Sequence, residues 1–544
     1  DLHSFPTRRS SDLWQTVYAF ISDGGIQEEI SQGVGRLAGH LGLDNLVMFY
    51  DSNGIQLSTT TGAVTSEDVA KKYESWNWKV ISIDGNDTDE IRRALLEAKA
   101  EKERPTLIIG HTIMGYGVVT SDGSSFESQV STHGQPLSAA GADINKTIAH
   151  LGGDPEHPFV IFPEVEALYA QRRQQLLTIV AAKKEQEKRW AAASPELAEK
   201  KRKWFARQLP EINWAALQQK PGVATRAASS AVLGVLAKQV ENMIVASADL
   251  SNSDKTDGFL KQTKALEKND FTGAFLQAGV AEFTMCCLCI GMSLHGGVIP
   301  ACGTFFVFSD YMKPAIRVAA LMETPVIFIW THDAFRVGED GPTHQPVEQE
   351  AQIRLMEKLQ NHHGRNSMLV LRPADGSETT VTWKMALENA DTPTGLILSR
   401  QNIKDLPARE SRTEEAQQAV KGAYIVQDEP DYDVILLASG SEVATLVEGA
   451  ALLRADGVKV RIVSVPSEGL FRKQPVAYQE AVLPKGRKKF GLSAGLPVTL
   501  EGLVGGDGTV WGMNSFGFSA PYKVLDEKLG YLPKIGRASC RERV

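Results

Sequence analysis

Two oxygen-bearing side chains, each shortly after an apolar segment, are the residues that most clearly suit a chemical task. Asp23 follows residues 17–22, and Asn53 lies some thirty residues later, after residues 46–50. Mg²⁺ takes few protein oxygens and completes its octahedron with water and phosphate oxygens, so these side chains and a backbone carbonyl suit a metal that binds a diphosphate. Backbone N–H groups near Gly24 could meet the phosphates. The alternative is that Asp23 caps a helix and Asn53 lies in a loop.

The residues between them predict a strand, a helix and a second strand. Residues 17–22 and 46–50 are apolar and of strand length, and apolar residues recur between them at helical spacing: Ile26, Ile30, Val34, Leu37 and Leu41. Such βαβ crossovers are right-handed and join parallel strands. Asp23 and Asn53 are therefore expected at the carboxyl-terminal edge of a parallel sheet, where open α/β sheets bind ligands.

A glycine motif in the same segment favours packing over phosphate binding. Residues 33–38 match the dinucleotide fingerprint in its alanine-ended form, and Asp51 follows at a plausible distance. That fingerprint needs its first glycine directly at a strand end, whereas Gly33 and Gly35 fall deep inside the expected helix. We therefore expect these glycines to allow close packing of the helix.

Glu282 is the first candidate for an acid that works in its protonated form. It lies directly before the apolar run 285–294, where its carboxyl group should be desolvated. Desolvation disfavours the charged form, so the protonated carboxyl is favoured, and this form can donate a hydrogen bond.

A glycine-punctuated loop follows a short apolar strand later in the chain. Residues 326–330 predict the strand, and the loop 338–346 brings Asp340 and His344 to the same crevice. Imidazoles move protons near neutral pH, and a carboxylate can hold a sugar hydroxyl. The alternative is a polar turn that caps a helix beginning near Gln345.

The first segment resembles the cofactor motif of the transketolases, enzymes that use thiamine diphosphate. Their motif runs from Gly-Asp-Gly to an asparagine some thirty residues later, and this chain has Ser-Asp-Gly at 22–24 and Asn53. Glu29 also stands where the family has glycine. The resemblance implies that Gly24 and Glu28 bind the cofactor. It also implies that Asp23, Asn53 and the Ile55 carbonyl bind the cofactor by holding its metal.

Two further strings extend the resemblance along the chain. Residues 132–137 look like a family loop that closes over the diphosphate, and the resemblance implies that His133 lies near phosphate and substrate and acts in catalysis. Residues 338–346 match a transketolase signature without departure. By resemblance, Asp340 reads the stereochemistry of a substrate hydroxyl, and His344 contacts the reacting carbonyl.

In the family, the glutamate equivalent to Glu282 protonates a pyrimidine nitrogen of thiamine, and aromatic residues sandwich that ring. Ala281 stands where many relatives have arginine, but the glutamate itself is present. Three aromatic residues match the sandwich: Phe305, Phe308 and Tyr311. Stacking and apolar burial suit a flat heteroaromatic ring. Aromatic residues at this helical spacing are otherwise typical of a protein core.

Four residues match the sugar-phosphate contacts of the family: Arg226, Ser253, His332 and Arg400. Arginine forks bind phosphate oxygens bidentately, so two arginines near one pocket favour a phosphorylated substrate. Taken singly, an arginine is more often part of a surface ion pair.

The resemblance also implies an activity, cofactors and an assembly. The enzyme would move a two-carbon ketol unit from a ketose phosphate to an aldose phosphate with thiamine diphosphate and Mg²⁺ (or Ca²⁺). The site would lie between the subunits of a homodimer, with the diphosphate on one chain and Glu282 of the partner subunit. Two other functions stay open: a thiamine enzyme like 1-deoxyxylulose-5-phosphate synthase or dihydroxyacetone synthase, and a non-catalytic product that binds the cofactor weakly or only offers a dimer surface.

Composition fits a large enzyme and disfavours several other classes. The chain has 544 residues, a net charge of −8 and no apolar run long enough to span a bilayer, so neither membrane nor nucleic acid is an expected partner. Five cysteines are too few for a disulfide scaffold, and a reducing cytoplasm is the expected compartment. Three of them lie in an apolar segment without a second ligand pair, which favours buried thiols over a metal site: Cys286, Cys287 and Cys289.

The predicted fold is α/β, with three parallel or mixed-sheet domains of the transketolase type, the first of them incomplete. A partial diphosphate-binding domain would cover residues 14–163, a charged helical connector 164–219, a pyrimidine-binding domain 220–405 and a C-terminal α/β domain 422–534. The length is consistent with about three domains.

Both ends of the chain are expected to be foreign to the fold. Residues 1–13 and 535–544 look like translated adapter DNA. Transketolases carry a sizeable segment before the Asp-Gly motif, with sheet elements and histidines. We therefore expect this chain to be an inactive fragment whose first strand lacks neighbours.

Overall fold

The computed structural model describes residues 15–535, so the adapter-like ends lie outside the described residues except for Ile535. Ile535 is buried in a hydrophobic core. The described chain divides into two compact units. The first comprises residues 15–199 with Glu267–Phe271, and the second comprises Lys200–Leu266 with residues 272–535.

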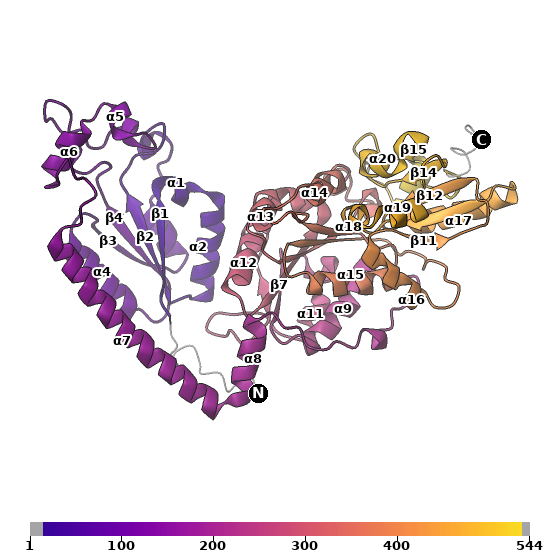
Figure 1. The fold of residues 1–544 in the computed structure, drawn as a ribbon, viewed down its shortest axis with the longest axis horizontal. Coiled ribbons are helices and arrows are strands. Elements are labelled where there is room, and N and C mark those ends of the chain that lie inside the picture. The colour runs from indigo at the N-terminus through magenta and orange to yellow at the C-terminus, as the bar shows by residue number, and fades with distance from the viewer. Residues whose placement is uncertain (1–14, 536–544) are drawn as a thin grey trace. The chain divides into compact units, whose positions relative to one another are not determined.

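The first unit is built on a parallel sheet in the order β1-β2-β4-β3 (Figure 1). Its strands are β1 (Val17–Ser22), β2 (Leu46–Ser52), β3 (Lys79–Asp84) and β4 (Thr106–His111). Ser22 at the end of β1 pairs with Asp51 near the end of β2. The predicted βαβ unit is confirmed, and Asp23 and Asn53 both follow strands at the same edge of the sheet.

Six helices of this unit accompany the sheet: α1 (Asp23–Gln27), α2 (Glu29–Leu41), α3 (Val69–Ser75), α4 (Thr88–Ala100), α5 (Leu137–Ala140) and α6 (Ile144–His150). The single helix predicted between β1 and β2 is in fact two, because Glu28 adopts φ −59° and ψ 136° between them. The Ser31 hydroxyl and the Gln32 amide donate to the carbonyls of Gly25 and Ile26, which satisfies acceptors at the break.

The glycines inside α2 serve packing, as predicted. A Cβ on Gly35 would lie 3.1 Å from the Trp76 ring, and one on Gly39 would lie 1.7 Å from the Trp76 carbonyl oxygen. Trp78 is buried in the same place and donates its indole N–H to the Gly35 carbonyl at 2.7 Å. The glycines therefore let α2 approach the turn before β3, and they make no phosphate loop.

Two helices form the predicted charged connector, α7 (Pro163–Ala193) and α8 (Pro195–Phe205). α7 has 31 residues and none of them is buried. Residues 206–219 contain only the short 3₁₀ turn Trp214–Ala216, so the connector is helical over part of its predicted length. Across residues 15–535, we find no helix with the length and apolar character needed to cross a membrane.

The second unit contains a six-stranded parallel sheet in the order β6-β5-β7-β8-β10-β9. Its strands are β5 (Met243–Ser247), β6 (Phe275–Gln277), β7 (Ile299–Phe305), β8 (Ile327–Thr331), β9 (Leu369–Leu371) and β10 (Thr394–Leu398). The accompanying helices are α9 (Thr225–Gln239), α10 (Ser251–Asp254), α11 (Asp257–Leu260), α12 (Glu282–His295), α13 (Ser309–Leu321), α14 (Gln349–Lys358), α15 (Gly376–Glu388) and α16 (Arg412–Ala416).

The same unit contains a five-stranded mixed sheet in the order β11-β13-β12-β14-β15. Its strands are β11 (Tyr424–Gln427), which is antiparallel, and the parallel β12 (Val434–Ala438), β13 (Val460–Ser464), β14 (Lys489–Leu492) and β15 (Gly508–Trp511). Its helices are α17 (Glu442–Ala455), α18 (Glu468–Lys473), α19 (Val476–Val482), α20 (Val498–Val504) and α21 (Tyr522–Lys528). With three largely parallel sheets, the predicted fold class is confirmed.

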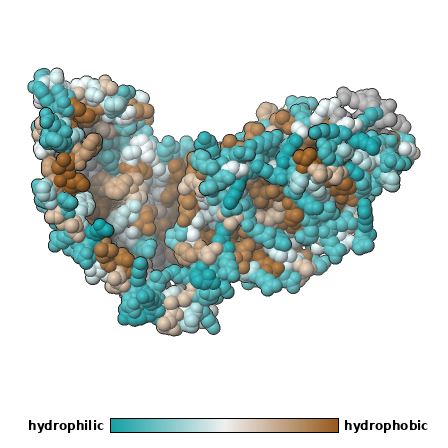
Figure 2. Space-filling view, viewed as in Figure 1, coloured by the Kyte–Doolittle hydropathy of each residue, from teal (hydrophilic) through white to brown (hydrophobic). Residues whose placement is uncertain are grey.

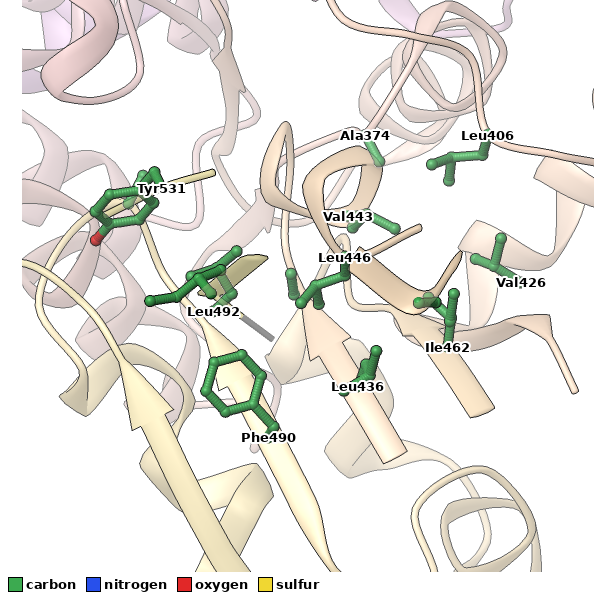
Figure 3. Close-up of a cluster of buried hydrophobic side chains, with 14 of the residues drawn as sticks. Ala374, Leu406, Val426, Leu436, Val443, Leu446, Ile462, Phe490, Leu492 and Tyr531 are labelled. Atoms are coloured by element: carbon green, nitrogen blue, oxygen red, sulfur yellow. The ribbon is translucent and has the colours of Figure 1, made fainter. Parts of the chain in front are cut away.

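A hydrophobic core packs the mixed sheet of the second unit against segments that follow β8 and β9. It contains residues of the mixed sheet and α17, such as Leu436, Val443 and Phe490 (Figure 3). It also contains Ala334 and Phe335, which follow β8. The segment after β8 is thus packed against the C-terminal part of the chain. Figure 2 shows hydrophilic residues interspersed with apolar ones on the visible surface.

Gly39→Ala tests the packing of α2. The added methyl would overlap the Trp76 carbonyl, and overpacking of this kind costs about 1–3 kcal/mol, occasionally more. Gly62→Ala is the matched control, because a Cβ there meets no atom within 4 Å. Urea unfolding should show a lower unfolding free energy for Gly39→Ala only. Equal values for both variants would contradict the packing role.

Candidate active site

The predicted functional residues fall into two clusters, one in each unit, and each is described by itself. The first lies at the carboxyl ends of β1 and β2. Asp23, the first residue of α1, is only 3% exposed. Its Oδ1 accepts a hydrogen bond from the Tyr50 hydroxyl at 2.6 Å, and its Oδ2 accepts from the backbone N–H groups of Asn53 and Gly54 at 3.1 and 3.0 Å. The structure therefore brings Asp23 to Asn53.

Asn53 and Ile55 form a tight turn beside this carboxylate. The Asn53 Oδ1 accepts the Ile55 N–H at 3.0 Å, and Ile55 is buried. Each carboxylate and amide oxygen can accept more than one hydrogen bond, so these oxygens retain lone pairs. One carboxylate, one amide oxygen and one carbonyl are hard donors that fit Mg²⁺ or Ca²⁺ with phosphate or water oxygens as further ligands. The described residues include no group of three or more His, Cys, Asp and Glu side chains that could hold a metal, so a cation here would depend on such neutral oxygens.

Tyr50 is a member of this cluster that the sequence reasoning missed. Burial, and then the hydrogen bond to Asp23, raises the pKa of Tyr50. The phenol therefore stays neutral and donates a hydrogen bond to the Asp23 carboxylate. Its place at the fifth position of an apolar strand, facing a core, gave no sign of this polar contact.

The other predicted residues of the first unit have fewer contacts. Gly24 is exposed, with no atom within 4 Å of an added Cβ, and Glu28 is exposed at the break between α1 and α2. His133 follows the 3₁₀ turn Val130–Thr132 and is half-buried. Its Nδ1 is enclosed and has no hydrogen-bond partner among the described residues. An enclosed imidazole nitrogen of this kind is suited to a polar ligand.

The second cluster lies at the carboxyl ends of β5, β7, β8 and β10. Glu282 begins α12 and is 7% exposed. The Thr304 hydroxyl on β7 donates to its Oε1 at 3.2 Å. Burial raises the pKa of Glu282, against the smaller opposing effects of its own backbone N–H and of Thr304. The predicted desolvated carboxyl is therefore present, and Thr304 is a partner that the sequence reasoning missed.

Three aromatic rings follow one another, starting at the residue after Thr304, whose hydroxyl contacts this carboxyl. Phe305 and Phe308 are parallel within 4° with centroids 5.9 Å apart, and Tyr311 lies 6.0 Å from Phe308. Their spacing is that of a helix, but the three residues do not share one helix. Phe305 ends β7, Phe308 lies in the 3₁₀ turn Phe306–Phe308, and Tyr311 is in α13. The 3₁₀ turn joins strand to helix and keeps the three rings in a row.

His332 is held in an unusual conformation at the end of β8. Its φ is +63°, and it is buried. Its ring lies against Phe305 with a centroid separation of 3.6 Å. The Arg226 Nη1 lies 3.2 Å from Nε2, and the Thr331 Oγ1 lies 2.8 Å from Nδ1. Because arginine only donates, Nε2 must accept, and Nδ1 carries the proton.

Burial and the neighbouring arginines keep this imidazole neutral. Burial, and then the charges of Arg226 and Arg400, lowers the pKa of His332 to about 2. Burial and Arg400 also lower the pKa of Arg226, whose Nη1 donates to the Ser253 carbonyl at 2.6 Å. The structure therefore brings the four predicted sugar-phosphate residues together, with Ser253 contributing its backbone oxygen. Arg226 and Arg400 are half-buried, and although the charge of Asp254 also acts on Arg226, two arginines beside one imidazole favour an anionic ligand.

The loop 338–346 brings His344 to the aromatic row but leaves Asp340 in solvent. The His344 ring meets Phe308 edge-on at 5.5 Å and its Nδ1 lies 2.9 Å from the Thr343 Oγ1. Asp340 is exposed. Gln345 is buried and donates to the carbonyls of Gly338 and Phe518, so the C-terminal part of the unit anchors the loop. The next helix, α14, begins at Gln349, which corrects the alternative that placed a helix start near Gln345.

The cysteines of α12 behave as predicted for core thiols. Cys286 and Cys289 are buried and Cys287 is half-buried. Burial raises the pKa of Cys286 well above its ordinary value and that of Cys287 to about 11. Thiols that stay protonated are poor nucleophiles and poor metal ligands.

Family comparisons cover almost the whole chain. Residues 7–210 match the model "Transketolase, thiamine diphosphate binding domain", residues 221–405 match "Transketolase, pyrimidine binding domain", and residues 422–532 match "Transketolase-like TK C-terminal domain".

Similar proteins agree with these matches. A transketolase of Halalkalibacterium halodurans is 39% identical over 522 residues, which cover 94% of this chain and 75% of the relative. Transketolase 2 of Vibrio parahaemolyticus is 40% identical over 527 residues, 94% of this chain and 76% of the relative. The solved transketolase of Leishmania mexicana matches with a TM-score of 0.88 and 34% identity over 97% of this chain and 75% of that one. The solved transketolase of Campylobacter jejuni matches with a TM-score of 0.82 and 34% identity over 96% of this chain and 76% of that one. The chain belongs to the transketolase family.

Proposed function

We propose that this protein transfers a two-carbon ketol unit from a ketose phosphate to an aldose phosphate with bound thiamine diphosphate. The observation that carries the proposal is the buried carboxyl of Glu282, bonded to Thr304, together with the aromatic row that begins at the next residue, Phe305, and continues with Phe308 and Tyr311. A protonated carboxyl next to stacked rings suits a flat basic heterocycle such as an aminopyrimidine.

The first cluster supplies what the charged end of the cofactor needs. Asp23, Asn53 and the Ile55 carbonyl would hold Mg²⁺ or Ca²⁺, and N–H groups near Gly24 would meet phosphate oxygens. Glu28 at the helix break and the enclosed Nδ1 of His133 would also lie at the cofactor. When bound, thiamine diphosphate supplies a nucleophilic carbon that no amino-acid side chain provides.

The second cluster supplies proton control and substrate recognition. Glu282 would donate a hydrogen bond to the pyrimidine ring, held in place by Thr304. His332, neutral and protonated at Nδ1, would act as a fixed polar contact rather than as an acid, since the pKa of His332 is lowered to about 2. His344, whose ring meets Phe308 edge-on, would contact the reacting carbonyl.

The arginines and the remaining residues would read the sugar phosphate. Arg226 and Arg400 would bind its phosphate, with Ser253 beside them. Asp340, exposed on its loop, would accept a hydrogen bond from a sugar hydroxyl, and His133 would contact the substrate near the diphosphate.

We also propose that two copies of the chain form the active enzyme. Residues in α12 and α13 or directly next to them leave large apolar side chains exposed: Val280, Leu294, Tyr311, Val318, Leu321 and Met322. A homodimer interface would cover such a face and is typically rich in apolar and aromatic residues. Tyr311 is among them, so dimer formation and the pyrimidine site would be linked.

A paired assay tests the function. The purified chain is given thiamine diphosphate and Mg²⁺ with xylulose 5-phosphate and ribose 5-phosphate, or with pyruvate and glyceraldehyde phosphate. We expect ketol transfer with the first pair only, a result that would correct the expectation from the sequence that this chain is an inactive fragment. Turnover of the second pair would indicate a deoxyxylulose-phosphate synthase instead, and binding of the cofactor without any turnover would indicate a non-catalytic product.

Glu282→Gln should lower the turnover of ketol transfer by about 10²- to 10⁴-fold, because the amide cannot give up the proton that the carboxyl holds. Thr304→Val, which removes only the hydroxyl that contacts Oε1, should have a smaller effect. Steady-state kinetics with the first substrate pair measure both. Wild-type turnover in Glu282→Gln would refute the assigned role.

The difference in unfolding free energy between this variant and the parent should depend on pH. Burial raises the pKa of Glu282 in the folded chain, so the folded state binds more protons than the unfolded state above about pH 4. Stability from this group therefore falls as the pH rises. Glu282→Gln lacks that loss, so its unfolding free energy relative to the parent should increase towards neutral pH. Urea unfolding at several pH values measures it, and a constant difference would contradict the raised pKa.

Tyr50→Phe should weaken Mg²⁺-dependent binding of thiamine diphosphate by about 10- to 100-fold, since Tyr50 holds the Asp23 carboxylate in place. Tyr73→Phe is the matched control, because the buried Tyr73 hydroxyl has no hydrogen-bond partner among the described residues. Calorimetric titration measures both affinities. An unchanged affinity in Tyr50→Phe, or an equal loss in Tyr73→Phe, would contradict the metal site.

A further inference from the structure

A chain of buried ion pairs begins at the residue after His332. The Asp333 Oδ2 accepts a hydrogen bond from the Arg372 Nη2 at 2.7 Å, and both side chains are almost fully buried. Arg372 follows β9. Burial raises the pKa of Asp333, and the charge of Arg372 opposes that effect. The position of Asp333 is therefore tied to the guanidinium of Arg372.

Arg372 is held in turn by the C-terminal part of the unit. Its Nη1 donates to the Ser439 carbonyl at 2.7 Å, and its Nη2 lies 2.7 Å from the Glu442 Oε2. Ser439 and Glu442 flank the turn between β12 and α17, where Gly440 has φ +64°. A Cβ on Gly440 would lie 2.8 Å from the Arg372 guanidinium, so the glycine permits this close approach.

Arg372 also lies 3.5 Å from the Glu350 Oε2 in α14, and a second arginine extends the network. The Arg336 Nη1 donates to the Glu442 Oε1 at 2.6 Å, and its Nε donates to the Asp526 Oδ1 at 2.6 Å in α21. Arg336 also lies over the rings of Phe335 and Tyr531, whose centroids are 4.6 Å apart. Glu442 thus connects the two arginines on either side of it, and both lead back to the segment that starts at His332.

This arrangement bears on the backbone of His332. A φ of +63° is unfavourable for a residue with a side chain, and such strain persists only where surrounding contacts fix the chain. Asp333 and Arg336 anchor the segment on the far side of His332 from β8. Removing one partner of a buried ion pair leaves an uncompensated buried charge, which is strongly destabilising. Every member of the network is therefore needed to hold the segment in place.

We propose that Glu442, acting through Arg372 and Asp333, is a positioning residue that fixes the His332 ring against Phe305 and Arg226. Glu442 lies in the C-terminal domain and does not itself contact His332, so it shapes the site only through its partners. That His332 serves a sugar phosphate rests on the proposed function; the positioning itself does not.

The test reads the His332 ring directly in the full chain, without cofactor or substrate. Histidine-selective ¹⁵N NMR distinguishes ring tautomers, and His332→Gln identifies the His332 signals. The parent should show one neutral species with the proton on Nδ1. Glu442→Gln removes the charge between the arginines and keeps the shape. It should shift the His332 signals and produce a second tautomer with the proton on Nε2.

Glu378→Gln is the matched control. Glu378 is equally buried and its side chain pairs with Arg412, Tyr424 and Ser464, whose side chains contact neither Arg372 nor Glu442 among the described residues. It should leave the His332 signals as in the parent, whatever its effect on stability. Unchanged signals in Glu442→Gln, or the same change in Glu378→Gln, would overturn the proposal.

Asp526→Asn decides the question if Glu442→Gln does not fold. The Asp526 side chain is 17% exposed, so its replacement is milder, and it still releases Arg336 from one carboxylate. A smaller shift of the same His332 signals supports the proposal, and no shift overturns it. Because no step uses thiamine diphosphate, failure here would leave ketol transfer untouched, and failure of the ketol-transfer assay would leave this result standing.

Discussion

The burial of one carboxyl group governs the chemistry of this protein. Glu282 begins α12 with its side chain almost enclosed, and among its side-chain contacts the Thr304 hydroxyl is a neutral donor rather than a cation. Without a paired positive charge, desolvation favours the protonated acid. The aromatic row from Phe305 to Tyr311 borders the same place. An acid kept neutral beside stacked rings is the arrangement from which the proposed use of thiamine diphosphate follows.

Parallel sheets explain why so many functional residues meet. All strands of a parallel sheet end at one edge, so the loops after β5, β7, β8 and β10 converge in the second unit, as those after β1 and β2 do in the first. The two clusters differ in charge. The first offers a carboxylate and neutral oxygens, which suit a cation, and the second offers Arg226 and Arg400, which suit a phosphate. The C-terminal sheet adds the ion pairs that fix the segment after β8.

Sequence patterns predicted the elements well, because the apolar periods of 17–22, 46–50 and 326–330 report burial directly. They also predicted that Asp23 would meet Asn53 and that Glu282 would be desolvated. Phe305, Phe308 and Tyr311 have helical spacing in the sequence without sharing one helix. A 3₁₀ turn between strand and helix produces the same three-residue spacing. Tyr50, Thr304 and Glu442 were missed because their roles depend on partners 27, 22 and many more residues away, which no local pattern records.

The most direct measurement is the titration of the Glu282 carboxyl itself, by infrared difference spectroscopy between the parent and Glu282→Gln. We predict that the protonated carboxyl band persists well above the ordinary glutamate pKa of about 4.3 and changes when thiamine diphosphate and Mg²⁺ are added. A carboxyl that titrates at the ordinary pKa and does not respond to the cofactor would contradict the account.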